Sequence, residues 1–93
     1  MPPARRSLTY DMCQAHLNHR IQTSHDAFAE NPPNFKLLRK RCNINRADWK
    51  RYLSGFEHIR RQAQDCASDE FEFYLSRLST HIAEAKQFYV KVV

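Results

Sequence analysis

The chain has 93 residues, of which 42% are hydrophobic and 27% charged, the balance of one folded domain with a modest core. Its single glycine excludes dinucleotide-binding and phosphate-loop motifs, which need several glycines at fixed spacing, and favours helices over hairpins. The net charge of +5 is local: residues 36–61 carry nine Lys and Arg against two acids, whereas residues 1–35 are neutral and residues 62–93 are net negative.

The first part of the chain is predicted to form one long helix behind a short tail. Residues 1–6 are expected to be a disordered basic tail, and residues 7–93 a single helical domain. The helix over residues 7–28 follows from apolar residues at three- and four-residue steps, namely Tyr10, Cys13, Leu17, Ile21 and Phe28. Pro32 and Pro33 then end it, because proline cannot donate a helical hydrogen bond.

A short helix, a tight break and a second long helix are predicted next. The short helix runs from Asn34 to about Cys42, and residues 43–45 form the break. Asn45 is expected to cap the following helix, with Asp48 near its positive end. That helix continues to about residue 66, and its apolar face is Trp49, Tyr52, Phe56, Ile59, Ala63 and Cys66. Gly55 within it indicates a close approach by a neighbouring element.

The last helix has the most regular pattern in the chain. It is expected to run from Asp69 to near the C-terminus, after a break at residues 65–68. Its apolar positions alternate without interruption at four- and three-residue steps: Phe71, Leu75, Leu78, Ile82, Ala85, Tyr89 and Val92. Three long amphipathic helices and one short helix predict an all-α protein, a small helical bundle. The seam over residues 71–92 also allows a second copy to complete the bundle as a homodimer.

The segment from Phe35 to Ser54 has the layout of a helix-turn-helix unit, whose second helix lies in the major groove of DNA. Within it, NINRADWKRYL resembles the recognition helix of the factor-for-inversion-stimulation family of bacterial DNA-binding regulators. This chain has Arg39 where that family usually packs a small residue, and Asn43 where the turn usually has glycine. The resemblance implies that the second helix binds double-stranded DNA.

The candidate nucleic-acid-binding residues come from this segment and from the polar side of the third helix. At about 100° per residue, Lys50, Ser54 and Arg61 lie opposite the apolar stripe, although Glu57 interrupts the basic face. Arginine can bond guanine, asparagine can pair with adenine, and lysine and serine suit phosphates. The predicted contacts are Arg39, Lys40, Arg41, Asn45, Arg46, Lys50, Arg51, Ser54 and Arg61, of which Arg46, Lys50, Arg51 and Arg61 are the main ones. Trp49 is on the buried stripe and is not expected to stack on bases.

Two alternatives to DNA binding remain open. The chain can be a small helical adaptor or inhibitor whose basic face docks on an acidic protein surface. It can also be a helical RNA-binding protein that reads the shape of an A-form duplex through its arginines.

Neither catalysis nor a cofactor is predicted. Cys13, His16 and His19 stand three residues apart, so the outer two point in directions about 120° apart and do not share a metal ion easily. The serines lack a nucleophile-elbow sequence. We expect a binding protein and not an enzyme.

The compartment is predicted from cysteine usage and from the absence of long apolar runs. No apolar run approaches 18 residues, and the N-terminus lacks the apolar stretch of a secretory signal. The three cysteines are an odd number without CxxC spacing, which argues against a disulfide framework. We expect a reduced intracellular protein, cytoplasmic or nuclear, that does not associate with a membrane.

Overall fold

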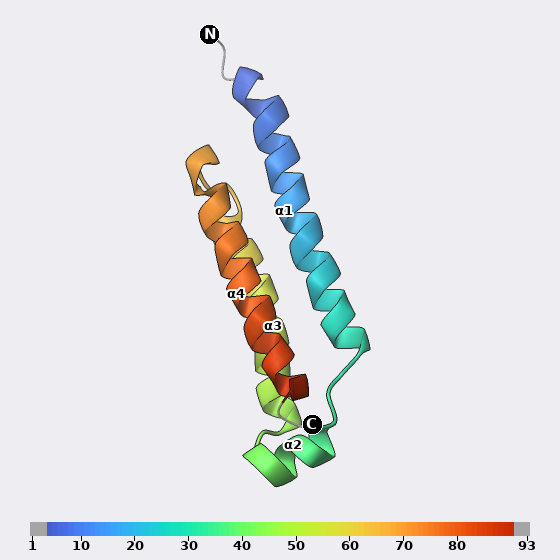
Figure 1. Cartoon of the computed structure of the whole chain (residues 1–93). Helices are drawn as coiled ribbons and strands as arrows, with labels where there is room; N and C mark the ends of the chain where they lie inside the picture. The colour runs from blue at the N-terminus through green and yellow to red at the C-terminus, as the bar shows by residue number, and fades with distance from the viewer. Residues whose placement is uncertain (1–3, 91–93) are drawn as a thin grey trace.

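The computed structural model describes residues 4–90, with side chains described from Tyr10 onward. Its elements, in chain order, are α1 (Ala4–Glu30), α2 (Phe35–Cys42), α3 (Arg46–Ala63), a 3₁₀ turn η1 (Ser68–Glu70) and α4 (Phe71–Val90). The three long helices run side by side, with α3 antiparallel to α1 and α4, while α2 lies across one end (Figure 1). The molecule is a rod of 60 × 20 × 19 Å. The predicted all-α bundle of three long helices and one short helix is confirmed.

The helix boundaries differ from the predicted ones by a few residues. Helix α1 begins at Ala4 and therefore includes residues 4–6 of the predicted tail, while residues 1–3 of that tail lie outside the described residues. Helix α3 ends at Ala63, earlier than predicted, because Gln64 is extended and Asp65 is left-handed with a φ of 61°. Asp69 and Glu70, expected to open the last helix, instead lie in η1, and α4 begins at Phe71. Val92 of the predicted seam also lies outside the described residues.

Short polar side chains define the ends of α2. The side chain of Asn34 accepts the N–H of Leu37 at 3.1 Å and caps the start of the helix. Asn43 ends the helix in the left-handed region, with a φ of 56°, which asparagine tolerates better than most residues. The chain then turns so that the N–H of Ile44 donates to the carbonyl of Leu38 at 3.3 Å. The predicted break at residues 43–45 is confirmed.

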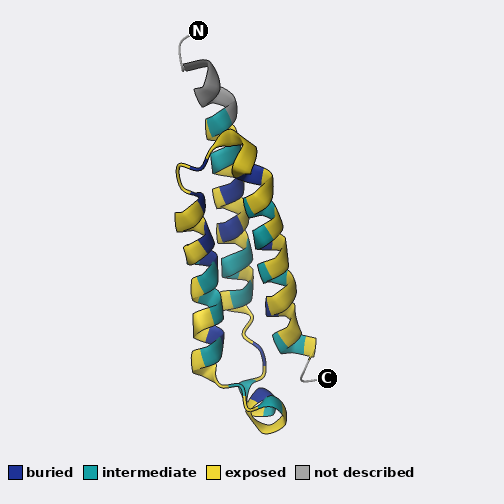
Figure 2. Ribbon diagram, turned by 90° about the vertical axis from the view of Figure 1, so that its left-hand side faces the viewer, coloured by how far each residue is buried: buried dark blue, intermediate teal, exposed yellow. Residues whose placement is uncertain are grey.

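The core follows the axis of the bundle, where buried positions of the long helices face one another (Figure 2). Its buried members are Leu17, Ile21, Phe56, Ile59, Ala63, Cys66, Phe71 and Leu78. At the end nearest α2, Trp49 meets Phe88 and Tyr89 of α4 with ring centroids 4.8 and 5.9 Å apart, and Phe28 of α1 at 6.0 Å. Trp49 is only 3% exposed, which confirms its predicted place in the core.

Gly55 marks the predicted close approach, and the neighbour is His81 of α4. An added Cβ at Gly55 would lie 2.4 Å from Cε1 of that ring. His81 stacks on the ring of Tyr52 with centroids 4.4 Å apart. Its Nε2 lies 2.8 Å from the carbonyl oxygen of Tyr52 and donates to it, because a carbonyl can only accept. The absent side chain at Gly55 thus makes room for a ring that joins α3 to α4.

The cysteines and the helix compositions add two findings. Cys13, Cys42 and Cys66 are free thiols. Burial raises the pKa of the Cys66 thiol, so it is protonated at neutral pH. None of the helices in residues 4–90 is both long enough and apolar enough to cross a membrane.

Candidate nucleic-acid interface

An open hollow of about 670 Å³ lies at the end of the bundle, between α2 and the start of α3. We call it the basic hollow, and it is lined by Phe35, Lys36, Arg39, Lys40, Asn45 and Arg46. Four of these six side chains are cationic, and none of the carboxylates in the described part of the chain lines it. A concave surface lined by one sign of charge concentrates counter-ions of the opposite sign.

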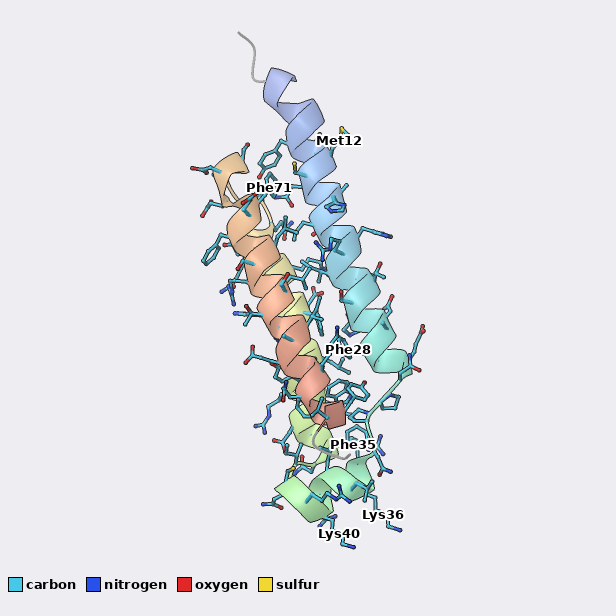
Figure 3. The ribbon with its side chains drawn as sticks, in the orientation of Figure 1. Met12, Phe28, Phe35, Lys36, Lys40 and Phe71 are labelled. Atoms are coloured by element: carbon cyan, nitrogen blue, oxygen red, sulfur yellow. The ribbon has the colours of Figure 1, made fainter. Side chains whose placement is uncertain are left out.

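The three cations on α2 share one side of that helix because of their spacing, and the anchoring of the helix leaves that side exposed. Leu38 is fully buried and attaches α2 to the bundle. Lys36, Arg39 and Lys40 are spaced as i, i+3 and i+4, so they are neighbours on the helix surface, and all three are exposed. Figure 3 shows Lys36 and Lys40 projecting from α2 away from the three long helices.

Arg46 contributes the fourth cation from the opposite side of the hollow. Its guanidinium carbon lies 4.5 Å from the centroid of the Phe35 ring, within the range of a cation–π contact. Phe35 is half-buried and is the apolar residue of the lining, whereas Arg46 remains exposed. The basic hollow therefore combines a cationic rim with a flat pair made of an aromatic ring and a guanidinium.

Asn45 and Arg51 have partners within the first turn of α3. The side-chain oxygen of Asn45 accepts the N–H of Asp48 at 3.1 Å, and the N–H of Asn45 donates to the Asp48 carboxylate at 2.9 Å. This reciprocal capping box confirms the predicted cap. Arg51 also donates to Asp48. The hydrogen bond from the Asn45 backbone, followed by that from Arg51, holds the pKa of the Asp48 carboxyl below its usual range. Asp48 thus forms an ion pair with Arg51, whose side chain stays exposed.

Lys50 and Ser54 lie further along the exposed side of α3. Lys50 is one turn beyond Arg46 and, within residues 10–90, forms no ion pair. The hydroxyl of Ser54 donates to the carbonyl of Lys50 at 3.0 Å. Lys50 can therefore extend the basic hollow along α3, while Ser54 is already satisfied by its own helix.

Arg61 lies apart from the basic hollow. It follows Arg46 by fifteen residues, which places it about 22 Å further along the helix axis. Its Nε lies 3.6 Å from a carboxylate oxygen of Glu57. Glu57 also accepts from Arg60 at 2.9 Å, and this hydrogen bond is the main reason that the pKa of the Glu57 carboxyl is lowered. The carboxylate that interrupts the basic face is thus shared between two arginines.

The predicted contacts therefore do not form one continuous surface. The structure brings together Arg39, Lys40, Asn45 and Arg46, with Lys50 one turn away. Arg41 is exposed in the last turn of α2 but does not line the basic hollow. Sequence reasoning missed two lining residues, Phe35 and Lys36, although the i, i+3, i+4 spacing of the cations on α2 was a usable signal.

Two further observations concern metal sites and relatives. Among the described residues, no three or more His, Cys, Asp and Glu side chains come together in a group able to hold a metal ion. No known protein family, curated protein or solved structure matches this chain.

Proposed function

We propose that this protein binds nucleic acid through the basic hollow, by contacts to phosphates that do not read the base sequence. The observation that carries the proposal is the convergence of four cationic side chains from two helices on one concave surface, which no carboxylate of residues 10–90 lines. Cations that replace the counterions of a phosphate backbone gain affinity from counterion release.

The pairing of the basic residues supports the same location. Within residues 10–90, none of Lys36, Arg39, Lys40, Arg46 and Lys50 forms an ion pair with a carboxylate. The arginines further along α3 are engaged by Asp48 or Glu57. The positive potential available to a ligand is therefore concentrated at the α2 end of the rod.

Two polar groups that could read bases already have hydrogen-bond partners within α3, which supports binding through phosphates. The side-chain oxygen of Asn45 caps α3, and the hydroxyl of Ser54 donates to its own helix. Sequence-specific readout needs such groups to be available for base edges. The polar side chains of the lining without such a hydrogen bond are lysines and arginines, which bind phosphates of any sequence, and of these the arginines can also bond guanine.

Two charge-matched double variants test the proposal. Lys36→Ala/Lys40→Ala removes two cations from the basic hollow, whereas Arg20→Ala/Arg61→Ala removes two exposed cations from the middle of α1 and the distant part of α3. Fluorescence anisotropy with a labelled oligonucleotide at about 50 mM salt is expected to show about a tenfold loss for the first variant and less than about a twofold loss for the second.

The same titration separates the alternatives. Equal losses for the two variants would mean that net charge alone drives binding. If poly-glutamate displaced the labelled oligonucleotide as effectively as unlabelled oligonucleotide does, an acidic protein surface would be favoured as the partner. An absence of binding to any oligonucleotide at this salt concentration would contradict the proposal.

A further inference from the structure

We infer that the basic hollow holds a single-stranded nucleic acid, with one unstacked base lying on the Phe35–Arg46 pair and the neighbouring phosphates on the α2 cations. This inference rests on the proposed function and specifies its ligand. It differs from the duplex DNA expected from the helix-turn-helix resemblance.

The flat pair inside the basic hollow is the first reason for a single strand. The Arg46 guanidinium lies over the Phe35 ring, with its central carbon 4.5 Å from the ring centroid, and this stack of two flat groups lines the same hollow as the three α2 cations. Unstacked bases bind in this way, on aromatic rings and on arginine planes. A duplex hides the faces of its bases, so it would leave this surface uncovered.

The fixed backbone at both residues of the pair is the second argument, and it favours a preformed site. Phe35 is the first residue of α2 and Arg46 is the first residue of α3. Each follows an asparagine cap whose side chain accepts a backbone N–H at 3.1 Å. Both backbones are therefore held before a ligand arrives, which lowers the cost of ordering the site upon binding.

The dimensions of the basic hollow fit a short stretch of one strand. Its volume of about 670 Å³ lies in the range of small-ligand pockets, which is the size of a nucleotide rather than of a duplex. Lys36 and Lys40 are about 6 Å apart along the axis of α2, so both can contact neighbouring phosphates of one strand. Because every base has a flat face, binding of this kind tolerates any sequence.

The test compares three ligands by fluorescence anisotropy at about 50 mM salt. They are a labelled 12-nucleotide oligothymidylate, a strand with the same phosphates but abasic at every position, and a 12-base-pair duplex. The wild-type protein is expected to bind oligothymidylate about five- to tenfold more tightly than the abasic strand, the contribution of one stacked base. It is also expected to bind the duplex more weakly than oligothymidylate.

Variants that separate charge from stacking make the test specific. Arg46→Lys keeps the charge and removes the guanidinium plane, so the preference for oligothymidylate over the abasic strand should fall below about twofold. Phe35→Leu keeps the apolar bulk and should have the same effect, with circular dichroism to confirm folding. Lys40→Ala should weaken both strands about equally and leave the preference intact.

Failure of this inference can be distinguished from failure of the proposed function. Equal affinity of the wild type for the two strands, or tighter binding of the duplex, would overturn the stacked base and leave phosphate binding in place. A Lys40→Ala variant that lost the preference as fully as Arg46→Lys would also overturn it. An absence of binding to all three ligands would overturn both proposals.

Discussion

The exchange Gly55→Ala is expected to destabilise this bundle, although the same exchange usually stabilises a helix. In a helix interior, alanine is favoured over glycine by about 1 kcal/mol. At Gly55, however, the new Cβ would lie 2.4 Å from Cε1 and 2.7 Å from Nε2 of His81. These separations are far inside van der Waals contact, so the ring must leave its position between α3 and α4.

The magnitude follows from the contacts that the ring gives up. The hydrogen bond from His81 to the Tyr52 carbonyl contributes about 1 kcal/mol. The ring contacts with Tyr52 and Phe56, at centroid distances of 4.4 and 4.5 Å, contribute about 0.5–1.5 kcal/mol each. After the gain in helix propensity is deducted, the free energy of unfolding should fall by about 1–3 kcal/mol.

Urea unfolding followed by circular dichroism at 222 nm measures this change, and the background His81→Ala provides the control. Without the imidazole the clash is absent, so Gly55→Ala should stabilise that background by up to about 1 kcal/mol. The reasoning would be refuted if Gly55→Ala stabilised the wild type, or if it had the same effect in both backgrounds.

Three further predictions concern pH and backbone conformation. The Tyr52 hydroxyl is buried, and burial, followed by the charge of nearby Glu84 and its side-chain interaction with the hydroxyl, raises the pKa of Tyr52 to about 12. Since this pKa exceeds the ordinary value of 10.0, the free energy of unfolding should fall as the pH rises from 10 towards 12. Urea midpoints measured at pH 10 and pH 12 should differ less in Tyr52→Phe than in the wild type. An equal difference in the two proteins would contradict this account. The lowered pKa of Asp48 acts in the opposite direction: its contribution to stability is present above the ordinary pKa of 3.8 and is lost as the pH falls through the lower pKa of the folded state. The stability of Asp48→Asn should therefore fall less steeply with acid than that of the wild type. Identical acid-unfolding curves would disprove the effect. Asn43→Ala should cost about 1 kcal/mol because φ is 56°, whereas Asn43→Gly should cost less; equal melting temperatures of the two variants would be inconsistent with the left-handed cap.

The features that sequence reasoning predicted are those encoded by residues a few positions apart. The cap at Asn45 could be predicted because its partner, Asp48, is three residues away. The burial of Trp49 and Phe56 followed from the helical period of the apolar residues. The sharing of Glu57 between Arg60 and Arg61 was not predicted, although the i, i+3 and i+4 spacing was a usable signal for it.

The basic hollow could not be predicted in this way because it depends on the orientation of α2 relative to α3. That orientation is set by the left-handed Asn43 and by the burial of Leu38, which involves the tertiary fold. The contact between Phe35 and Arg46 is a consequence of the same orientation. Likewise, the period of α3 indicated that something packs against Gly55 but could not identify the residue on α4.

The salt dependence of oligonucleotide binding tests the central claim most directly. The basic hollow supplies four cations and Lys50 can supply a fifth. If these four or five cations contact the phosphates of a single strand, a plot of the logarithm of the association constant against the logarithm of salt concentration should have a slope of about −3 to −3.5. Substituting Lys36 and Lys40 by alanine should reduce the steepness of that slope by about 1.4, because about 0.7 is lost for each cation. A slope near zero in the wild type, or a double variant with an unchanged slope, would contradict the assignment of phosphate binding to this end of the bundle.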